Sequence, residues 1–347
     1  MGTLIGSFTV STKERNFLYD NIKAVLITFV VAAHYVRVSG IFDLNEFNAV
    51  FYTFAFSFIM QGFFFISGFF SKKVDKCHNG AVENFLIPYI IFTILMYITR
   101  LVVNGTANLQ FYSPTHGMWF FLNMFVYRYI IKYAVKIKGI RTISFAFYIF
   151  AGLFPILGRT LSLGRIFSFF IFFIMGYYAD ESTFKKIRNL KRYYVIPSFA
   201  CGTALFSYLV VKMKPDVELF QFREYFGAYG ITNVQGIVFR LVLLVFTVLF
   251  LIAITNLMPD KKCFLTTIGM RTLPIFVFHI IVRYVIKRTA FFAYFPLPVS
   301  YILLILSVIL TLYLFTRPAA LKLYNIIVDY SCRPLHFIKK LINSDPS

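Results

Sequence analysis

The sequence predicts an all-α polytopic membrane protein with about ten transmembrane helices and both termini in the cytoplasm. Three observations predict this class. Of 347 residues, 59% are hydrophobic and the mean hydropathy is +0.75, which is unlike a soluble domain. The apolar residues gather in continuous runs of about 16–22 residues, close to the length that a helix needs to cross a bilayer. Basic residues fall in alternate loops between these runs.

Ten apolar runs follow one another along the chain. They lie near residues 17–37, 48–70, 84–103, 117–135, 142–158, 165–180, 193–212, 237–258, 271–289 and 298–316. The part from 142 to 180 is interrupted by Pro155, Gly158 and Gly164, so it forms either two short spans or one span and a re-entrant piece. We therefore expect a cytoplasmic segment (1–16), a membrane domain (17–316) and a basic cytoplasmic tail (317–347).

The net charge of +21 would suit a nucleic-acid-binding protein, but its distribution indicates topology instead. With the N-terminus inside, 20 Lys and Arg residues fall in cytoplasmic segments and 6 in outside loops. This asymmetry is the one that orients membrane proteins. We expect a multi-pass protein of the plasma membrane that contacts the bilayer and binds no nucleic acid, with its basic tail against the anionic inner leaflet.

The first apolar run carries ionisable residues. Asp20, Lys23 and His34 lie within it, and on a helix Lys23, Ile27 and His34 all fall within about 60° of Asp20. An ionisable group at bilayer depth costs roughly 2.5–3.5 kcal/mol, so it usually faces a cavity and serves a function. The alternative is a structural Asp20–Lys23 pair with a buried, hydrogen-bonded His34.

His34 is the candidate for chemistry. A neutral imidazole is a suitable base for removing a proton from a hydroxyl, which points to acyl transfer or proton-coupled transport. The sequence has no phosphate-binding G-x-x-x-x-G-K-[ST] loop, no G-x-S-x-G nucleophile turn and no metal-ligand spacing, so ATP-driven pumping, α/β-hydrolase chemistry and a bound metal are not favoured. The second intramembrane histidine, His279, is expected to be packed and neutral.

Several other polar residues are candidates for binding. Arg159 and Arg165, in RTLSLGR, could hold an anionic group or an oxyanion, or could be interfacial arginines. Trp119 and Asn123 lie one turn apart near the outer end of the fourth run, where a Trp is often a membrane-interface anchor.

The second run ends in GFFFISGFFSKK. Ser67 and Gly68 would allow close helix packing, and Lys72 and Lys73 either clamp a phosphate or only mark the cytoplasmic edge. The outside loop 213–236 mixes carboxylates with aromatic rings, which suits carbohydrate or a helix lying in the membrane interface.

These segments resemble a known family. RNFLYDNIKAVLITFVVAAH resembles the opening signature of the acyltransferase-3 family of integral-membrane acyltransferases, in its fucose 4-O-acetylase-like branch, where an Arg and a D-x-x-K pair precede an apolar run ending in His. FSFIMQGFFFISGFFSKK resembles the second helix of that family, with its F-F-x-x-S-G-[FY] core. Later segments resemble the family in the expected order, namely LIPYIIF, GMWFFLNMFVYR, RTLSLGRIFSFFIFFIMGYYAD and LPIFVFHII.

The resemblance implies a ten-helix enzyme that moves an acyl group, commonly acetyl, from cytoplasmic acyl-CoA to an outward-facing sugar hydroxyl. Acetyl-CoA would be a donor substrate, with no permanently bound cofactor, and the acceptor a surface polysaccharide or lipid-linked glycan. By position, His34 would be the catalytic histidine. The donor end would be shaped by Arg15, Asp20 and Lys23, and a later basic site by Arg159 and Arg165.

One position departs from the pattern of the branch. Its members often carry a histidine shortly before the Met of the second helix, whereas here Ile59 precedes Met60. This puts a second catalytic or acceptor-orienting histidine in that span in doubt, and our hypothesis is that Gln61 takes the polar role.

The predicted mechanism uses His34 as general base on an acceptor hydroxyl that attacks the thioester directly, with a transient acyl-enzyme on His34 as a variant. Arg15, Lys72 and Lys73 would bind the phosphates of CoA. Fourteen residues of helix place His34 about 21 Å from Asp20 along the axis. The arm of the donor must therefore reach His34 through a pore beside the first span.

Two other classes of function fit the same residues. A transporter or flippase for a sugar-containing substrate would use Asp20, Lys23 and His34 as a proton relay. A non-catalytic structural subunit would leave the intramembrane His34 unexplained.

Overall fold

The structure is a computed structural model that describes residues 16–114 and 117–343, and in this part of the chain every regular element is a helix. The α-helices are α1 (Leu18–Val38), α2 (Glu46–Phe56), α3 (Ile59–Phe69), α4 (Val74–Asn79), α5 (Ile87–Asn104), α6 (Trp119–Ala134), α7 (Ile140–Phe150), α8 (Leu163–Tyr178), α9 (Glu181–Arg188), α10 (Arg192–Met213), α11 (Asn233–Leu257), α12 (Phe264–Met270), α13 (Thr272–Thr289), α14 (Leu297–Phe315) and α15 (Pro318–Asn343). Short 3-10 or π-helical turns are η1 (Phe42–Leu44), η2 (Val82–Leu86), η3 (Ala151–Leu153), η4 (Pro155–Leu157), η5 (Thr160–Ser162), η6 (Val217–Gln221), η7 (Phe226–Tyr229) and η8 (Phe291–Tyr294).

Seven helical segments of the described chain are long and apolar enough to cross a membrane. They are Leu18–Val38, Glu46–Phe69, Val82–Asn104, Thr160–Tyr178, Arg192–Met213, Asn233–Leu257 and Leu297–Phe315. α12 and α13 add an eighth if they count as one span bent by 80°. The predicted runs at 117–135 and 142–158 form α6, with 16 residues, and the shorter α7. The all-helical membrane class is confirmed, and the count of ten spans stays a prediction.

The irregular part of the chain between residues 142 and 180 is resolved into two unequal helices. α7 ends at Phe150, three short 3-10 turns follow, and α8 begins at Leu163. Only the second of the two helices, with η5, has the length of a span. The turns between them carry Pro155, Gly158 and two residues with left-handed backbone, Leu161 (φ 50°) and Ser162 (φ 58°).

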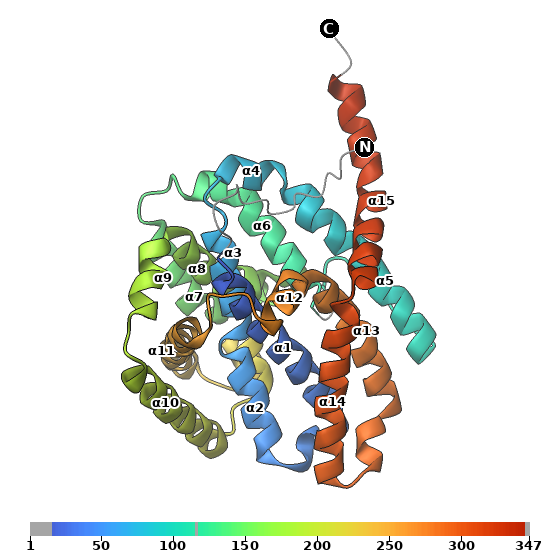
Figure 1. Cartoon of the computed structure of the whole chain (residues 1–347). Coiled ribbons are helices and arrows are strands. Elements are labelled where there is room, and N and C mark those ends of the chain that lie inside the picture. The colour runs from blue at the N-terminus through green and yellow to red at the C-terminus, as the bar shows by residue number, and fades with distance from the viewer. Residues whose placement is uncertain (1–15, 115–116, 344–347) are drawn as a thin grey trace.

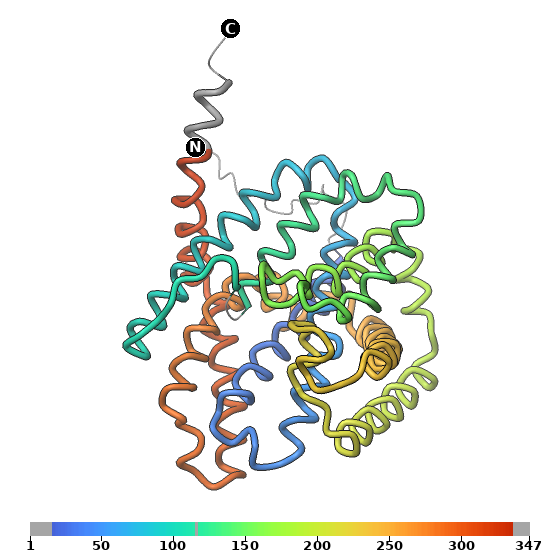
Figure 2. The backbone as a smooth tube through the Cα atoms, turned by 180° about the vertical axis from the view of Figure 1, so that it is seen from behind, coloured from blue at the N-terminus to red at the C-terminus, as the bar shows by residue number. Residues whose placement is uncertain are grey.

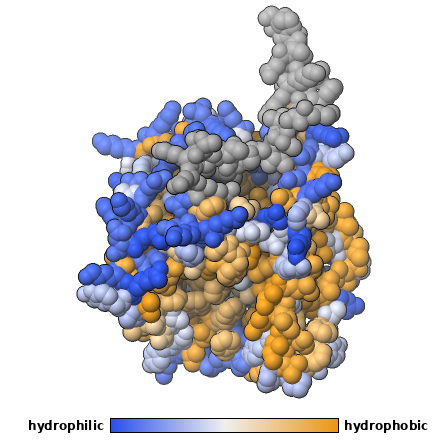
Figure 3. Space-filling model, viewed as in Figure 1, coloured by the Kyte–Doolittle hydropathy of each residue, from blue (hydrophilic) through white to orange (hydrophobic). Residues whose placement is uncertain are grey.

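α1 lies at the centre of the bundle, and Figure 1 shows the other helices arranged around it. It packs against α12, α13, α2, α14 and α3. α14 instead lies at the periphery, where Ile302, Ile305 and Ile309 are each more than half exposed. Hydrophobic side chains cover this side of the molecule in Figure 3, while hydrophilic ones gather toward the end from which α15 projects. Such an apolar outer surface is suited to lipid.

The second predicted run is one span broken in the middle. α2 ends at Phe56 and α3 begins at Ile59, so backbone carbonyls near the break lose their helical partners. Gln61 Nε2 donates to the Phe56 carbonyl (3.1 Å), and Thr247 Oγ1 donates to the Ser57 carbonyl (2.6 Å). These side chains supply hydrogen-bond donors to the carbonyls at the break, inside the bundle.

α3 and α8 approach so closely that only glycine fits at the contact. A Cβ atom on Gly68 would lie 2.0 Å from the Phe173 carbonyl oxygen, and one on Gly176 would lie 1.9 Å from the Phe65 carbonyl oxygen. The close packing predicted around Gly68 is therefore confirmed.

The long loop 213–236 forms no α-helix between the end of α10 and the start of α11. It folds into η6 and η7, with Phe220, Phe222 and Phe226 buried. In Figure 2 this segment (yellow) lies against the middle of the bundle. Gln221 Nε2 donates to the hydroxyl of Tyr52 in α2 (2.8 Å), so the loop forms part of the wall of the site described next.

Candidate active site

A cavity of about 420 Å³ lies beside the C-terminal half of α1. Its wall combines residues from α1, the α2–α3 span, the segment before α6, α8, the loop 213–236 and α13. The polar or charged side chains in this wall are His34, Arg37, Tyr52, Gln110, Ser113, Arg165, Glu218, Gln221, Arg223, Arg283 and Lys287. Rings of Phe56, Trp119 and Phe276 line it as well. The fold thus builds a polar chamber that His34 lines.

His34 is paired with a second histidine. Its Nδ1 lies 2.9 Å from Nε2 of His279, and the two rings are stacked with their centroids 5.1 Å apart. His279 Nδ1 lies 2.9 Å from the Ile275 carbonyl. Because a carbonyl oxygen only accepts, this Nδ1 carries a proton, and neutral His279 accepts at Nε2. His34 therefore donates from Nδ1, and the lone pair of its neutral imidazole is on Nε2.

His279 is fully buried in α13. As expected, it is a packed histidine, but sequence reasoning did not bring it to His34, 245 residues earlier. A signal was present, because His279, Arg283 and Lys287 recur every four residues and so share one face of α13. Arg283 and Lys287 both line the cavity, and sequence reasoning missed both.

Arg165 and Trp119 meet in the cavity wall. The Arg165 guanidinium lies 4.5 Å from the centre of the Trp119 ring. Its Nε and Nη2 donate to the Gln221 backbone carbonyl (3.1 Å) and to Gln221 Oε1 (3.0 Å). Only 6% of Arg165 is exposed. This two-pronged contact fixes the guanidinium at the edge of the cavity.

The other members of these two predicted pairs lie elsewhere. Arg159 is largely exposed and forms an ion pair with Glu224. Asn123 is fully buried in α6. Neither Arg159 nor Asn123 lines the cavity. Of the predicted pairs Arg159–Arg165 and Trp119–Asn123, only Arg165 and Trp119 lie in its wall.

The N-terminal end of α1 is held by polar contacts. Lys23 Nζ lies 2.9 Å from Asp20 Oδ1, and the backbone at Asp20 packs against Gly269, where a Cβ would lie 1.7 Å from the Asp20 carbonyl oxygen. Asn21, which sequence reasoning did not select, donates to the carbonyls of Pro259 (2.8 Å) and Lys261 (3.1 Å).

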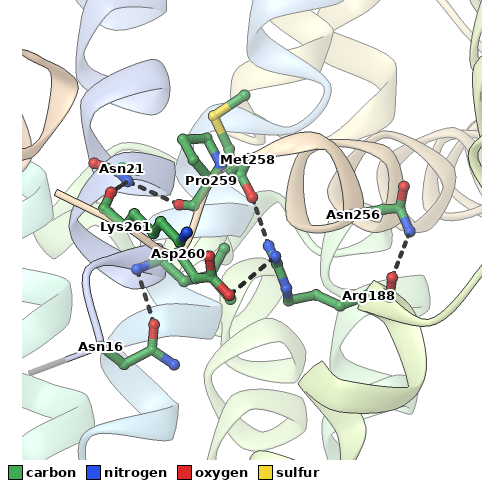
Figure 4. Close-up of polar contacts among 9 residues, drawn as sticks. Asn16, Asn21, Arg188, Asn256, Met258, Pro259, Asp260 and Lys261 are labelled. Atoms are coloured by element: carbon green, nitrogen blue, oxygen red, sulfur yellow. Dashed lines mark hydrogen bonds and ion pairs between the residues drawn. The ribbon is translucent and has the colours of Figure 1, made fainter. Parts of the chain in front are cut away.

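Figure 4 shows that the same loop is held from its other side by Arg188, which contacts the Met258 carbonyl and Asp260. The predicted donor end is thus a region of structural ties between α1, α9 and the loop before α12. Arg15, also predicted for this end, lies outside the described residues.

Lys72 and Lys73 follow α3. Lys72 Nζ donates to the carbonyls of Tyr177 and Ala179 at the C-terminus of α8, where a cation is favoured by the helix dipole. Burial lowers the pKa of Lys72, and the nearby Asp180 opposes that shift. Lys73 is exposed. Of the two, Lys72 already has backbone partners.

The fold and the cavity define a polytopic helical membrane protein with a histidine pair at a mostly cationic chamber. Residues 17–317 match the family model of the acyltransferase-3 family, described as an acyltransferase domain. Since this covers most of the chain, the protein belongs to that family and is a membrane acyltransferase. The resemblance to its fucose 4-O-acetylase-like branch stays a prediction. No curated protein and no solved structure matches the chain significantly.

Proposed function

We propose that this membrane acyltransferase transfers an acetyl group from cytoplasmic acetyl-CoA to a hydroxyl of a cell-surface polysaccharide or of its lipid-linked precursor. The observation that carries the proposal is the His34–His279 pair at the wall of the cavity. The proposal includes ten membrane helices, both termini in the cytoplasm and location in the plasma membrane, with His34 toward the outer side.

In the proposed reaction His34 is the general base. Its Nε2 takes the proton of the acceptor hydroxyl while the hydroxyl oxygen attacks the thioester carbonyl carbon. The C–S bond then breaks, and the CoA sulfur leaves with the proton from the imidazolium. His279 stabilises the imidazolium by accepting from its Nδ1, as an orienting partner does for other catalytic histidines. Direct transfer is favoured over an acyl-enzyme because Nε2 can then serve as base and as acid in turn.

Arg165 is proposed to stabilise the negative charge that develops on the carbonyl oxygen. Its guanidinium is fixed in advance by Gln221 and Trp119, and a donor that does not have to move on reaction contributes most to transition-state stabilisation.

The cavity wall supports a carbohydrate acceptor. Aromatic rings such as Trp119 offer apolar faces for the C–H faces of a sugar. The amides of Gln110 and Gln221 and the hydroxyl of Ser113 offer donors and acceptors for its hydroxyl groups. This mixture of rings and uncharged polar groups is typical of sites that bind sugars.

The alternative of a proton-coupled transporter relies on a relay along α1. Asp20 is paired with Lys23, and the buried side chains of α1 between that pair and His34 include Ile27, Val30 and Val31. Apolar groups on this path do not pass protons, so α1 by itself favours the acyltransferase over a relay.

The test is acetyl transfer by the full chain in membranes. Vesicles holding the wild-type protein and cell-surface glycan are given labelled acetyl-CoA on the cytoplasmic side. We expect label in the glycan, and a loss of at least about 10²-fold with His34→Ala. A matched control is His78→Ala, since His78 contacts the Tyr129 carbonyl in the α4–α6 region and should leave transfer unchanged. Full transfer by His34→Ala, or substrate uptake without any acyl transfer, would contradict the proposal.

A further inference from the structure

The charged side chains around the cavity are strongly unbalanced. Five of them are cationic and one is a carboxylate, and they are Arg37, Arg165, Arg223, Arg283, Lys287 and Glu218. The carboxylate of Glu218 lies 3.8 Å from Arg37 Nη2. Arg165 and Arg283 are buried, Arg37 and Arg223 are partly buried, and Lys287 is exposed. Buried cations without enough anions are costly unless a ligand supplies the missing charge.

Arg283 is the clearest case. It is 7% exposed, and its Nη1 is buried without a hydrogen-bond partner among the described residues. A guanidinium normally uses its donors on carboxylates, phosphates or carbonyls. The Arg283 side chain lines the cavity, and its guanidinium forms no ion pair with a carboxylate of the described residues. An anionic ligand in the cavity would balance this charge.

The excess positive charge lies within one or two helical turns of the histidine pair. Arg283 follows His279 by four residues on α13, which is about 6 Å along the helix axis. Lys287 continues the same face by one more turn, and Arg37 follows His34 by three residues on α1. The cations therefore lie toward the C-terminal ends of both helices, which is the outer side in the proposed topology, within one or two sugar units of the reacting hydroxyl.

We propose that the acceptor carries an anionic group, a carboxylate or a phosphate, and that Arg283, with Lys287 and Arg37, binds this group while His34 acts on a nearby hydroxyl. This inference rests on the proposed function, which supplies the sugar acceptor. The anion belongs to the acceptor rather than to CoA because the donor enters from the opposite end of α1. Arg165 is held by Gln221 and serves the reacting carbonyl instead.

The test measures binding and transfer separately on the purified full chain in lipid nanodiscs. The probes are methyl glucoside, methyl glucuronoside and glucose 6-phosphate, which present a neutral group, a carboxylate and a phosphate. We expect one or both anionic sugars to raise the thermal unfolding temperature and the neutral sugar to have little effect. With labelled acetyl-CoA, the KM of the preferred anionic sugar should be at least about tenfold below that of methyl glucoside.

Arg283→Gln should raise the KM of the anionic sugar at least about tenfold, remove its thermal stabilisation and leave the KM of acetyl-CoA within about twofold. Arg288→Gln is the matched control, because Arg288 is an exposed neighbour outside the cavity wall. If Arg283→Gln does not fold, Lys287→Gln is used instead, because Lys287 is exposed. It should raise the KM of the anionic sugar and reduce the thermal stabilisation in the same direction but by less, with the KM of acetyl-CoA unchanged.

The outcomes separate this inference from the proposed function. Equal use of neutral and anionic sugars by the wild type, with transfer dependent on His34, overturns the anionic acceptor and keeps the acyltransferase. A raised KM for acetyl-CoA in Arg283→Gln also overturns it, since the cations would then hold the donor. Stabilisation by anionic sugars that is lost in Arg283→Gln, without acetyl transfer, supports the anion site and contradicts the proposed function.

Discussion

Nδ1 of His34 in α1 lies 2.9 Å from Nε2 of His279 in α13, and His279 in turn contacts the Ile275 carbonyl through its Nδ1. The Ile275 carbonyl can only accept a hydrogen bond, so both hydrogen bonds run in one direction, from His34 to His279 and from His279 to Ile275. The His34–His279 bond couples two helices that are far apart in sequence. We therefore expect His279 to act as a positioning residue that fixes which nitrogen of His34 carries the proton.

Removing the acceptor nitrogen of His279 should lower kcat. His279→Phe keeps a ring of similar size but leaves the Nδ1–H of His34 without this acceptor, so we expect kcat to fall about 10²-fold. His279→Gln offers an amide oxygen and should recover part of that loss. Steady-state transfer from labelled acetyl-CoA measures both, with the KM of acetyl-CoA expected to stay within about twofold.

A tautomer measurement separates positioning from packing. Nitrogen-15 NMR of labelled histidine should show the proton of His34 on Nδ1 in the wild type and a mixture of tautomers in His279→Phe. An unchanged tautomer and unchanged kcat in that variant would show that His279 only fills space.

The sequence predicted much of the architecture because bilayer burial imposes long apolar runs. Runs such as 193–212 and 237–258 fold as α10 and α11 almost at the predicted bounds. Those interrupted by Pro or Gly were harder to place, since a break in a span depends on partners elsewhere. Thr247 of α11, which donates to the Ser57 carbonyl, is one such partner. It lies 190 residues further along the chain, so the sequence around Ser57 does not predict it.

The site was predictable only in part. The polar stripe on α1 singles out His34, since an ionisable group in an apolar run is unusual. What surrounds it depends on tertiary contacts, because His279 comes from α13 and Gln221 from a loop that folds back over the bundle. The pair Arg159 and Arg165 illustrates the limit, since the left-handed residues Leu161 and Ser162 lie between them and only Arg165 lines the cavity.

The close contact of α3 and α8 should not tolerate a side chain. In Gly176→Ala the added Cβ meets the backbone oxygen of Phe65. This oxygen cannot rotate away, so we expect the free energy of unfolding to fall by about 1–3 kcal/mol or more. Thermal unfolding in detergent, followed by size-exclusion chromatography, measures it. Gly80→Ala is the control, because there the nearest atom is the amide of the flexible Asn84 side chain. Equal unfolding temperatures for the two variants would contradict the packing argument.

Lys72 is expected to act on stability rather than on the donor. Lys72→Met removes the contacts of its ammonium group with the C-terminal carbonyls of α8, at a cost of roughly 0.3–1 kcal/mol for a cation at a helix C-terminus. The KM of acetyl-CoA should stay within about twofold. Lys73→Met, which changes the exposed neighbour, gives the comparison. If Lys72→Met alone raises the KM of acetyl-CoA tenfold, Lys72 binds the phosphates of CoA instead.

Arginine at position 165 should not be replaceable by lysine. The Arg165 guanidinium donates from Nε and Nη2 to two oxygens of Gln221 while it stacks on Trp119. An ammonium group has the charge but not this planar fork, so it cannot hold the same position. Hydrogen bonds to a charged group contribute about 1.5–3 kcal/mol, so Arg165→Lys should reduce kcat roughly ten- to hundredfold.

Arg159→Lys is the matched control for that substitution, six residues away on the same segment. Arg159 is largely exposed and pairs with Glu224 outside the cavity wall, and an exposed pair contributes little. We therefore expect transfer within about twofold of the wild type. The comparison is decisive because both variants keep the charge. Unchanged transfer in both would therefore mean that RTLSLGR acts only through its net charge. Equal losses at the two positions would contradict a special role of Arg165, whereas a loss confined to Arg165→Lys supports the need for its fixed guanidinium.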